Sequence, residues 1–107
     1  MAFVFKETAT YEWPVTVEFP SGGKFEKQSF TAVFKKMPRS AFNELIEQGD
    51  DVLIGGIMDG WDEINDDDGN PIPFNKKNLQ KLFDDPYVLR ATVSAYTESL
   101  LGAQAKN

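Results

Sequence analysis

The sequence predicts a single α+β domain over residues 1–107, with an N-terminal antiparallel sheet of two or three strands followed by three or four short helices. Its 107 residues are 41% hydrophobic and 26% charged, which is the size and balance of one globular domain. Apolar residues alternate with polar ones over about residues 3–36, as in half-buried strands, and follow helical spacing from residue 39 onward. Nine Phe, two Trp and three Tyr supply the apolar surface for a core.

The strand pattern lies on either side of a turn at residues 20–23, where two Gly tolerate the positive φ of a tight turn. Before this turn, every second residue is apolar, namely Trp13, Val15, Val17 and Phe19. After it, the alternation continues with Phe30, Ala32 and Phe34. Pro14 has no backbone N–H, so its strand is expected at an edge or at a bulge. Phe3-Val4-Phe5 is a candidate third strand.

Two helices are expected in the middle of the chain. The first covers residues 39–48, where apolar side chains share one face, and Gly49 ends it. The second covers residues 51–61 and begins at Asp50 and Asp51, whose charges favour a helix N-terminus. Its apolar face consists of Ile54, Ile57, Met58 and Trp61. Gly55 and Gly56 weaken it, each by about 1 kcal/mol relative to Ala.

Two further helices follow a turn-rich loop or short hairpin at residues 65–74. Asn75 caps a helix over residues 76–84, and Asp85 with Pro86 starts the last helix, over residues 86–101. The apolar stripe of the last helix contains Leu89, Val93, Tyr96 and Leu100. Gly102 ends this helix, and residues 102–107 are expected to form a loose tail.

Charge is distributed unevenly along the chain, whose net charge is −6. Residues 40–75 contain no Lys or Arg, and their ten acids are Glu44, Glu47, Asp50, Asp51, Asp59, Asp62, Glu63, Asp66, Asp67 and Asp68. Such a field repels nucleic-acid phosphates and attracts basic partners. The alternative is that these acids only keep the region soluble.

The sequence lacks the residues on which most catalytic and cofactor sites depend. It has no His and no Cys, which removes the commonest general base, the thiolate nucleophile and the usual zinc ligands. It also lacks a Gly-x-Ser-x-Gly nucleophile elbow and a Gly-rich phosphate loop. The carboxylates lie in polar surroundings rather than in the apolar pocket that acid catalysis uses. We therefore expect neither an enzyme nor a cofactor.

The acidic segment suggests one metal site, a calcium-binding loop of the EF-hand type. With Gly69 at the sixth position of an EF-hand loop, Asp66 and Asp68 fall on ligand positions. Ile64 and Asn75 then occupy the two anchor positions, where Asp and a bidentate Glu belong. A solvated turn is the better interpretation, and no metal is expected.

Membrane and nucleic-acid partners are not expected either. No stretch approaches the roughly 20 apolar residues of a membrane helix, and residues 1–6 lack the order of a secretory signal. The absence of Cys fits a reducing cytoplasm. Basic residues do occur near the predicted sheet, namely Lys24, Lys27, Lys35, Lys36 and Arg39. The negative total charge argues against phosphate binding but leaves an acidic nucleic-acid mimic as an alternative.

Several segments of the chain resemble the tail assembly chaperones of long-tailed bacteriophages and prophages. The most specific are residues 60–64 and 68–74, which read Gly-Trp-Asp-Glu-Ile and Asp-Gly-Asn-Pro-Ile-Pro-Phe. The resemblance extends to Trp13-Pro14-Val15, to residues 30–35, to Leu82-Phe83 and to Pro86-Tyr87-Val88. It implies a protein of the host bacterial cytoplasm that is absent from the mature virion. Gly55-Gly56 departs from the family pattern, which leaves the packing of that helix open.

The resemblance implies binding partners rather than a reaction. Chaperones of this family coat the long helical tape measure protein and recruit tail tube subunits. A small acidic domain with an apolar groove suits that role, because it covers apolar stripes and keeps the complex soluble; self-association is also possible. Four aromatic residues are candidates for the binding surface, with ordinary core positions as the alternative: Trp61, Phe74, Phe83 and Tyr87. The alternative functions are a virion-resident tail or head-completion protein and an acidic nucleic-acid-mimic inhibitor.

Overall fold

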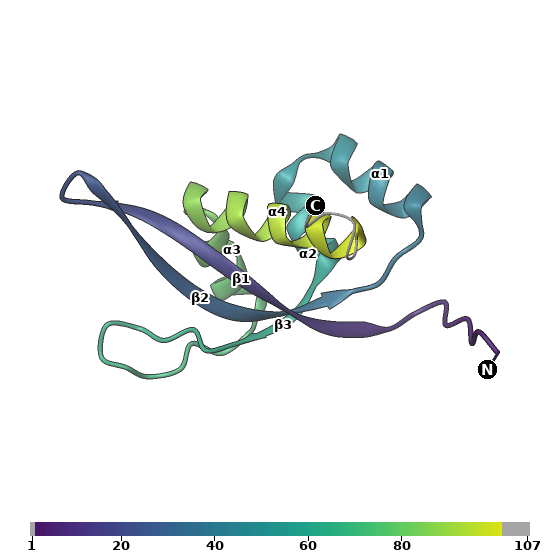
Figure 1. Ribbon diagram of the computed structural model, residues 1–107, viewed down its shortest axis with the longest axis horizontal. Coiled ribbons are helices and arrows are strands. Elements are labelled where there is room, and N and C mark those ends of the chain that lie inside the picture. The colour runs from purple at the N-terminus through teal and green to yellow at the C-terminus, as the bar shows by residue number, and fades with distance from the viewer. Residues whose placement is uncertain (1, 102–107) are drawn as a thin grey trace.

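Three antiparallel strands and four helices make up the structure, a computed structural model that describes residues 2–101. The sheet has the order β1-β2-β3, with β1 at Thr10–Ser21, β2 at Lys24–Lys35 and β3 at Met58–Asp62. The helices are α1 (Arg39–Gln48), α2 (Asp50–Ile57), α3 (Lys76–Phe83) and α4 (Pro86–Leu101) (Figure 1). The predicted α+β class is confirmed. Gly102 and the expected tail lie outside the described residues.

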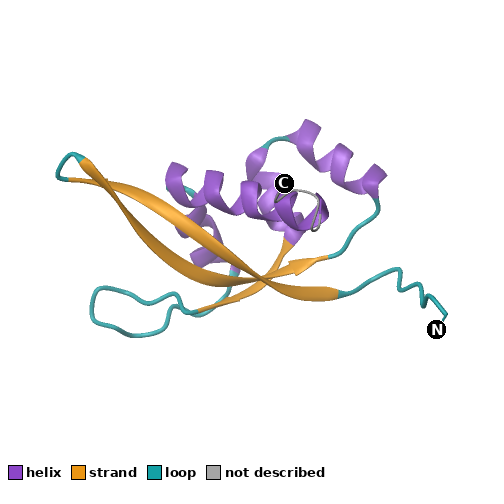
Figure 2. Ribbon diagram, viewed as in Figure 1, coloured by secondary structure: helices purple, strands orange, loops and turns teal. Residues whose placement is uncertain are grey.

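A long two-stranded hairpin forms the frame of the sheet, and Figure 2 shows it extending past the helices. Ser21 pairs with Lys24 across a two-residue turn. Gly22 and Gly23 have φ values of 57° and 83°, the left-handed conformation that such hairpin turns require. The predicted turn is confirmed. Because the turn fixes the register, Val15 lies opposite Phe30 and both are buried.

Pro14 and Pro20 explain why β1 is an edge strand. The register is fixed by a two-residue turn, so Ser21 and every second residue before it form the hydrogen-bonded pairs with β2. Pro14 and Pro20 fall on the intervening positions, where a backbone N–H would point away from β2. The two prolines therefore remove no hydrogen bond from the sheet. They also leave the outer edge of β1 with fewer donors for pairing with another chain.

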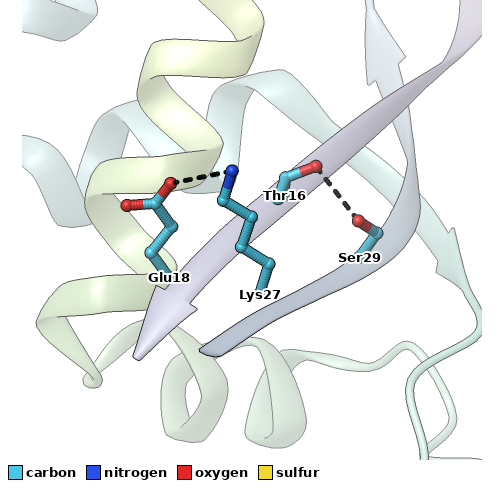
Figure 3. Close-up of polar contacts among 4 residues, drawn as sticks. All are labelled: Thr16, Glu18, Lys27 and Ser29. Carbon is cyan, nitrogen blue, oxygen red and sulfur yellow. Dashed lines mark hydrogen bonds and ion pairs between the residues drawn. The ribbon is translucent and has the colours of Figure 1, made fainter. Parts of the chain in front are cut away.

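The face of the hairpin that carries Thr16 and Glu18 is polar. Figure 3 shows the hydroxyl oxygens of Thr16 and Ser29, which lie 3.0 Å apart, and Lys27 Nζ, which lies 3.8 Å from Glu18 Oε1. Both pairs sit directly across the strands in the hairpin register. Such exposed pairs contribute little energy individually. They do mark this face as solvated, opposite the face that supplies the core.

The second helix was predicted to extend to residue 61, and this predicted end is wrong. Residues 58–61 belong to β3, because α2 ends at Ile57 and Met58 adopts extended backbone with φ −92° and ψ 131°. Strand β3 pairs with the end of β2, placing Trp61 opposite Ala32. Long-range strand pairing thus overrides a local helical pattern that two glycines already weaken.

The suggested third strand at Phe3-Val4-Phe5 is also wrong. These residues precede β1 and have no strand conformation. Phe3 is 87% exposed and Phe5 67% exposed, so the segment forms an arm outside the sheet. The third strand is β3, which joins the sheet at the edge of β2 that faces away from β1.

The core lies between one face of the sheet and the helices, with α4 packed along β1. Tyr96 is central to it: its ring meets that of Phe34 edge-on at 5.0 Å, and its hydroxyl donates to Lys35 O at 2.9 Å. Burial, with a smaller effect from the neighbouring Tyr11, raises the pKa of Tyr96 to about 12. The phenol therefore stays neutral and keeps its hydrogen bond throughout the ordinary pH range.

The buried face of α4 differs from the predicted stripe. The side chains that are buried are Val88, Thr92, Ala95 and Tyr96. Of the predicted stripe, only Tyr96 is buried; Leu89 and Val93 are half-buried, and Leu100 is 51% exposed. The reason is that α4 contacts the sheet on one side and α2 on another, so its apolar surface is wider than one stripe. The predicted stripe flanks the core instead of facing it.

The two helices in the second half of the chain begin at the predicted capping residues. Asn75 Oδ1 accepts from Asn78 N at 2.8 Å at the start of α3. Asp85 Oδ1 accepts from Tyr87 N at 2.8 Å at the start of α4, with Pro86 in the first helical position. Gly49 separates α1 from α2 with a φ of 108°.

Candidate protein-binding surfaces

Three of the four predicted binding residues form one aromatic cluster. The Trp61 ring packs edge-on against Phe74 with centroids 4.8 Å apart, and the Phe83 ring lies 6.5 Å away. The Trp61 indole N–H donates to Ile72 O at 2.8 Å, so the polar group of this side chain already has a partner. Phe83 is only 5% exposed and belongs to the core, whereas Phe74 is 38% exposed. The cluster fastens the loop of residues 65–74 to the sheet.

The fourth residue, Tyr87, lies apart from this cluster. It is in the first turn of α4 and its ring is 6.1 Å from that of Phe19, near the end of β1. Tyr87 is 39% exposed. Phe74 and Tyr87 are therefore the two predicted residues that present substantial surface, and they do so at separate places.

The loop itself is an ordered turn. Asp66 Oδ1 accepts from Asp68 N and Asn70 N, both at 2.9 Å, and Gly69 has a φ of 84°. A bridge between Asn65 and Pro71 closes it. Across the described residues, 2–101, no group of three or more potential ligand side chains is placed to hold a metal ion.

A cleft on the helical side of the molecule was not predicted from the sequence. It has a volume of about 480 Å³ and lies between the first turns of α2 and the exposed flank of α4. Its lining residues are Asp50, Pro86, Leu89, Arg90, Val93 and Ser94. We call this cleft the helical groove. Leu89 and Val93, which we had placed in the core stripe, form its apolar floor.

Exposed apolar side chains also lie on the helices outside the helical groove. Leu100 follows Leu89 and Val93 on the same stripe of the helix and is 51% exposed. From Leu89 to Leu100 this stripe is about 16 Å long. Ile46 on α1 is 49% exposed. Tyr96 interrupts this stripe at the surface because it is buried in the core, so the apolar surface open to another helix is discontinuous, with the groove floor and the separate positions Leu100 and Ile46.

Acidic side chains are concentrated on the two helices before β3, and one of them, Asp50, lines the helical groove. Glu44 and Glu47 lie on α1, and Asp50 and Asp51 in the first turn of α2. Within the part of the chain that the structure describes, no acid of residues 40–75 forms an ion pair. Their charge is therefore available to a basic partner. None of the helices in that same part is long and apolar enough to cross a membrane.

A second hollow lies beside the hairpin, and we call it the hairpin groove. Its larger section, about 540 Å³, lies between the end of β1, the loop of residues 65–74, α3 and α4. A smaller section, about 190 Å³, borders residues 28–30 of β2. Both sections are lined by Phe19, Leu82 and Val88, which form a shared apolar floor.

Comparisons with known proteins add nothing to these observations: no family model, no curated protein and no solved structure matches the chain.

Proposed function

We propose that this protein is a tail assembly chaperone of a long-tailed phage or prophage, which binds the tape measure protein and helps to recruit tail tube subunits without catalysing a reaction. The sequence resemblance of residues 60–64 and 68–74 supports the assignment. The helical groove is the structural observation that carries it, because a chaperone of this kind needs an open apolar surface for a helix.

The helical groove suits an amphipathic helix. Leu89 and Val93 offer an apolar floor between α4 and Asp50 at the start of α2, and Leu100 is a further exposed apolar residue on α4. A helix with apolar residues at positions i, i+3, i+4 and i+7 presents a matching ridge. The tape measure protein exposes such ridges until the tail tube encloses it.

Charge favours the same type of partner. Asp50 lines the groove, and the further acids of α1 and α2 add to the negative field on the same part of the chain, which attracts a segment that carries Lys or Arg next to its apolar ridge. After binding, the net charge of −6 on each copy keeps the coated filament soluble. Arg90 lies in the groove as well and provides one position for an acid of the partner.

Co-purification with the tape measure protein tests the proposal. Ser94→Arg places a bulky positive charge on an exposed lining residue of the helical groove, and Leu100→Arg places one on an exposed apolar residue further along α4, so the fold is retained while binding falls by about tenfold or more. Thr16→Arg is the control for the added charge, because Thr16 is exposed on the polar face of β1, away from the helical groove. Phe74→Ala and Tyr87→Ala report whether the exposed aromatic residues contribute.

Three results contradict the proposal. Undiminished binding by the Ser94→Arg, Leu100→Arg double variant removes the helical groove from the interface. Detection of the chain in purified phage particles favours a virion-resident tail component. Salt-dependent competition with DNA for a host DNA-binding protein favours nucleic-acid mimicry.

A further inference from the structure

Strand β2 is longer than the strand that covers its outer edge. Strand β3 pairs only with residues 31–34 of β2, so no described strand covers residues 24–30 on that edge. In the hairpin register, the backbone N–H and C=O groups of Glu26, Gln28 and Phe30 point toward β1. The backbone groups of Phe25, Lys27 and Ser29 therefore point outward. They form a free edge that can bind one more strand.

The free edge exists because the chain turns away from β2 after β3. Glu63 has a φ of 68°, a left-handed conformation that interrupts a strand. Its side chain accepts a hydrogen bond from Thr31 Oγ1 at 2.8 Å, and its N–H donates to Asp62 Oδ1 at 2.9 Å. These contacts fix the turn. The loop of residues 65–74 then runs beside the hairpin without pairing with it (Figure 1).

The hairpin groove lies next to this free edge. Its smaller section is lined by Gln28, Ser29 and Phe30 on the strand side and by residues 63–65 on the loop side. Phe19, Leu82 and Val88 form the floor. A strand edge with unpaired hydrogen-bonding groups beside an apolar hollow is the arrangement used in β-strand addition, where alternate side chains of an extended segment enter the hollow.

The same chain carries a segment with the matching properties. Residues 2–9 form the arm that precedes β1, and Phe3, Val4 and Phe5 are 87%, 73% and 67% exposed. In an extended segment Phe3 and Phe5 point to the same side. The polar contacts of the arm all involve one residue, Lys36. Its backbone N–H donates to Ala9 O, and its Nζ donates to Lys6 O and lies 4.7 Å from the centre of the Phe5 ring. The arm is therefore held by few contacts.

The arm cannot reach the groove of its own copy. It leaves the sheet where Thr10 pairs with Lys35, at the end opposite the hairpin turn (Figure 1). Lys27 is eight residues from Lys35 along β2, about 27 Å away. Phe3 is seven residues from Thr10, so even a fully extended arm places it at most about 24 Å away, before the chain has reversed direction and crossed to the far edge of β2. Only the groove of another copy is within reach.

We propose that the arm of one copy adds as a strand to the free edge of β2 in a second copy, with Phe3 and Phe5 in the hairpin groove. The arm supplies apolar side chains and Lys6, and the groove supplies an apolar floor with Asp66 and Asp85 among its lining residues. The two contributing surfaces differ, so the interface is heterologous. In a dimer, one copy retains a free arm and the other a free edge, so further copies can add and the assembly grows as a linear chain.

Self-association of the full chain tests this interface in the absence of any tape measure protein, so its outcome is independent of the proposed function. Sedimentation velocity is expected to show assembly that increases with concentration up to about 1 mM. Phe3→Asp with Phe5→Asp blocks the arm and weakens assembly by at least about tenfold. Both positions are highly exposed, so this variant keeps its fold.

The free edge is blocked separately. Lys27→Pro removes an outward N–H, as Pro14 and Pro20 do on β1, and Lys27→Ala is the control that keeps this donor. Each blocked variant alone is expected to be monomeric. A mixture of the arm-blocked and edge-blocked variants forms a 1:1 dimer and nothing larger, because one intact arm meets one intact edge.

Hydrogen exchange gives a measurement that does not depend on the proline variant. The Lys27 amide exchanges more slowly in the assembled wild type and returns to the monomer rate in the arm-blocked variant. The interface is refuted by a wild-type chain that stays monomeric, by assembly that survives the arm substitutions, or by a mixture of blocked variants that does not dimerise.

Discussion

Gly55 and Gly56 are neighbours in α2 but have opposite surroundings. A Cβ atom at Gly55 would meet no atom within 4 Å, whereas a Cβ atom at Gly56 would lie 2.4 Å from Leu45 Cδ1 on α1. Neither glycine has a positive φ, so an Ala side chain is compatible with the backbone at both positions. Substituting each by Ala therefore compares an open position with a close helix–helix contact in the same turn of helix.

The expected magnitudes follow from two effects. Ala in place of Gly in a helix stabilises by at most about 1 kcal/mol, and we expect about 0.5–1 kcal/mol for Gly55→Ala. Gly56→Ala has the same helical gain but must displace Leu45, a half-buried residue packed against the core. Overpacking of this kind costs about 1–3 kcal/mol. We expect Gly56→Ala to range from neutral to destabilising by about 2 kcal/mol.

Urea unfolding followed by the fluorescence of Trp13 and Trp61 measures both changes, with the helical circular dichroism as a second probe. The comparison is repeated in a Leu45→Ala background, where the obstructing methyl group is absent. There, Gly56→Ala should become as favourable as Gly55→Ala. Equal effects of the two substitutions in the wild-type background, or a penalty at Gly56 that persists without Leu45, would refute the packing of α1 on α2.

Three further changes test the core and the loop. Thr92 is fully buried and its hydroxyl has no hydrogen-bond partner among the described residues, so Thr92→Val should raise the free energy of unfolding by about 1 kcal/mol in urea titrations. Because the pKa of Tyr96 is raised to about 12, stability present below pH 10 should fall by roughly 2 kcal/mol as the pH rises toward 12, and Tyr96→Phe should remove that part of the pH dependence. Trp61→Phe removes the hydrogen bond to Ile72 O; it should cost about 1 kcal/mol in urea titrations and speed hydrogen exchange of the Ile72 amide.

The hairpin and the caps were predictable because their determinants are local. Gly22 and Gly23 fix the turn, and alternation then places Val15 and Phe30 on the buried face. Asn75 and Asp85 each satisfy backbone N–H groups within three residues. In such segments the sequence neighbours are also the spatial neighbours, so a pattern of a few residues is sufficient.

The boundary between α2 and β3 depends on residues far away in the sequence. Ile57 and Met58 are both buried, as the helical pattern required, but Met58 reaches the core as a strand residue opposite Phe34. A helical face and a strand face can bury the same apolar residues, and only the partner strand decides between them. Gly55 and Gly56 lie just before this boundary.

The candidate surfaces were predictable only in part. The segments that resemble tail assembly chaperones pointed to Trp61, Phe74 and Phe83 as candidates, and the structure brings these three together. The helical groove depends on how far α4 is rotated about its axis, and the hairpin groove depends on where Glu63 turns the chain. Those are tertiary properties. The positive φ of Glu63 has no signal in the sequence, because Glu is an unusual residue in that conformation.

The helical groove and the arm interface together lead to a quantitative prediction about filament coating. The molecule is 50 Å long, so copies joined end to end would each cover at most about 33 residues of a helix. Weak individual contacts then combine along a long partner. The arm-blocked variant should bind a tape measure segment of about 30 residues as tightly as the wild type, because one copy suffices there. It should bind segments several times longer at least about tenfold more weakly than the wild type, because neighbouring copies no longer support one another. Calorimetric titration of segments of graded length measures both, and a loss that does not grow with segment length would show that the arm contributes nothing to coating.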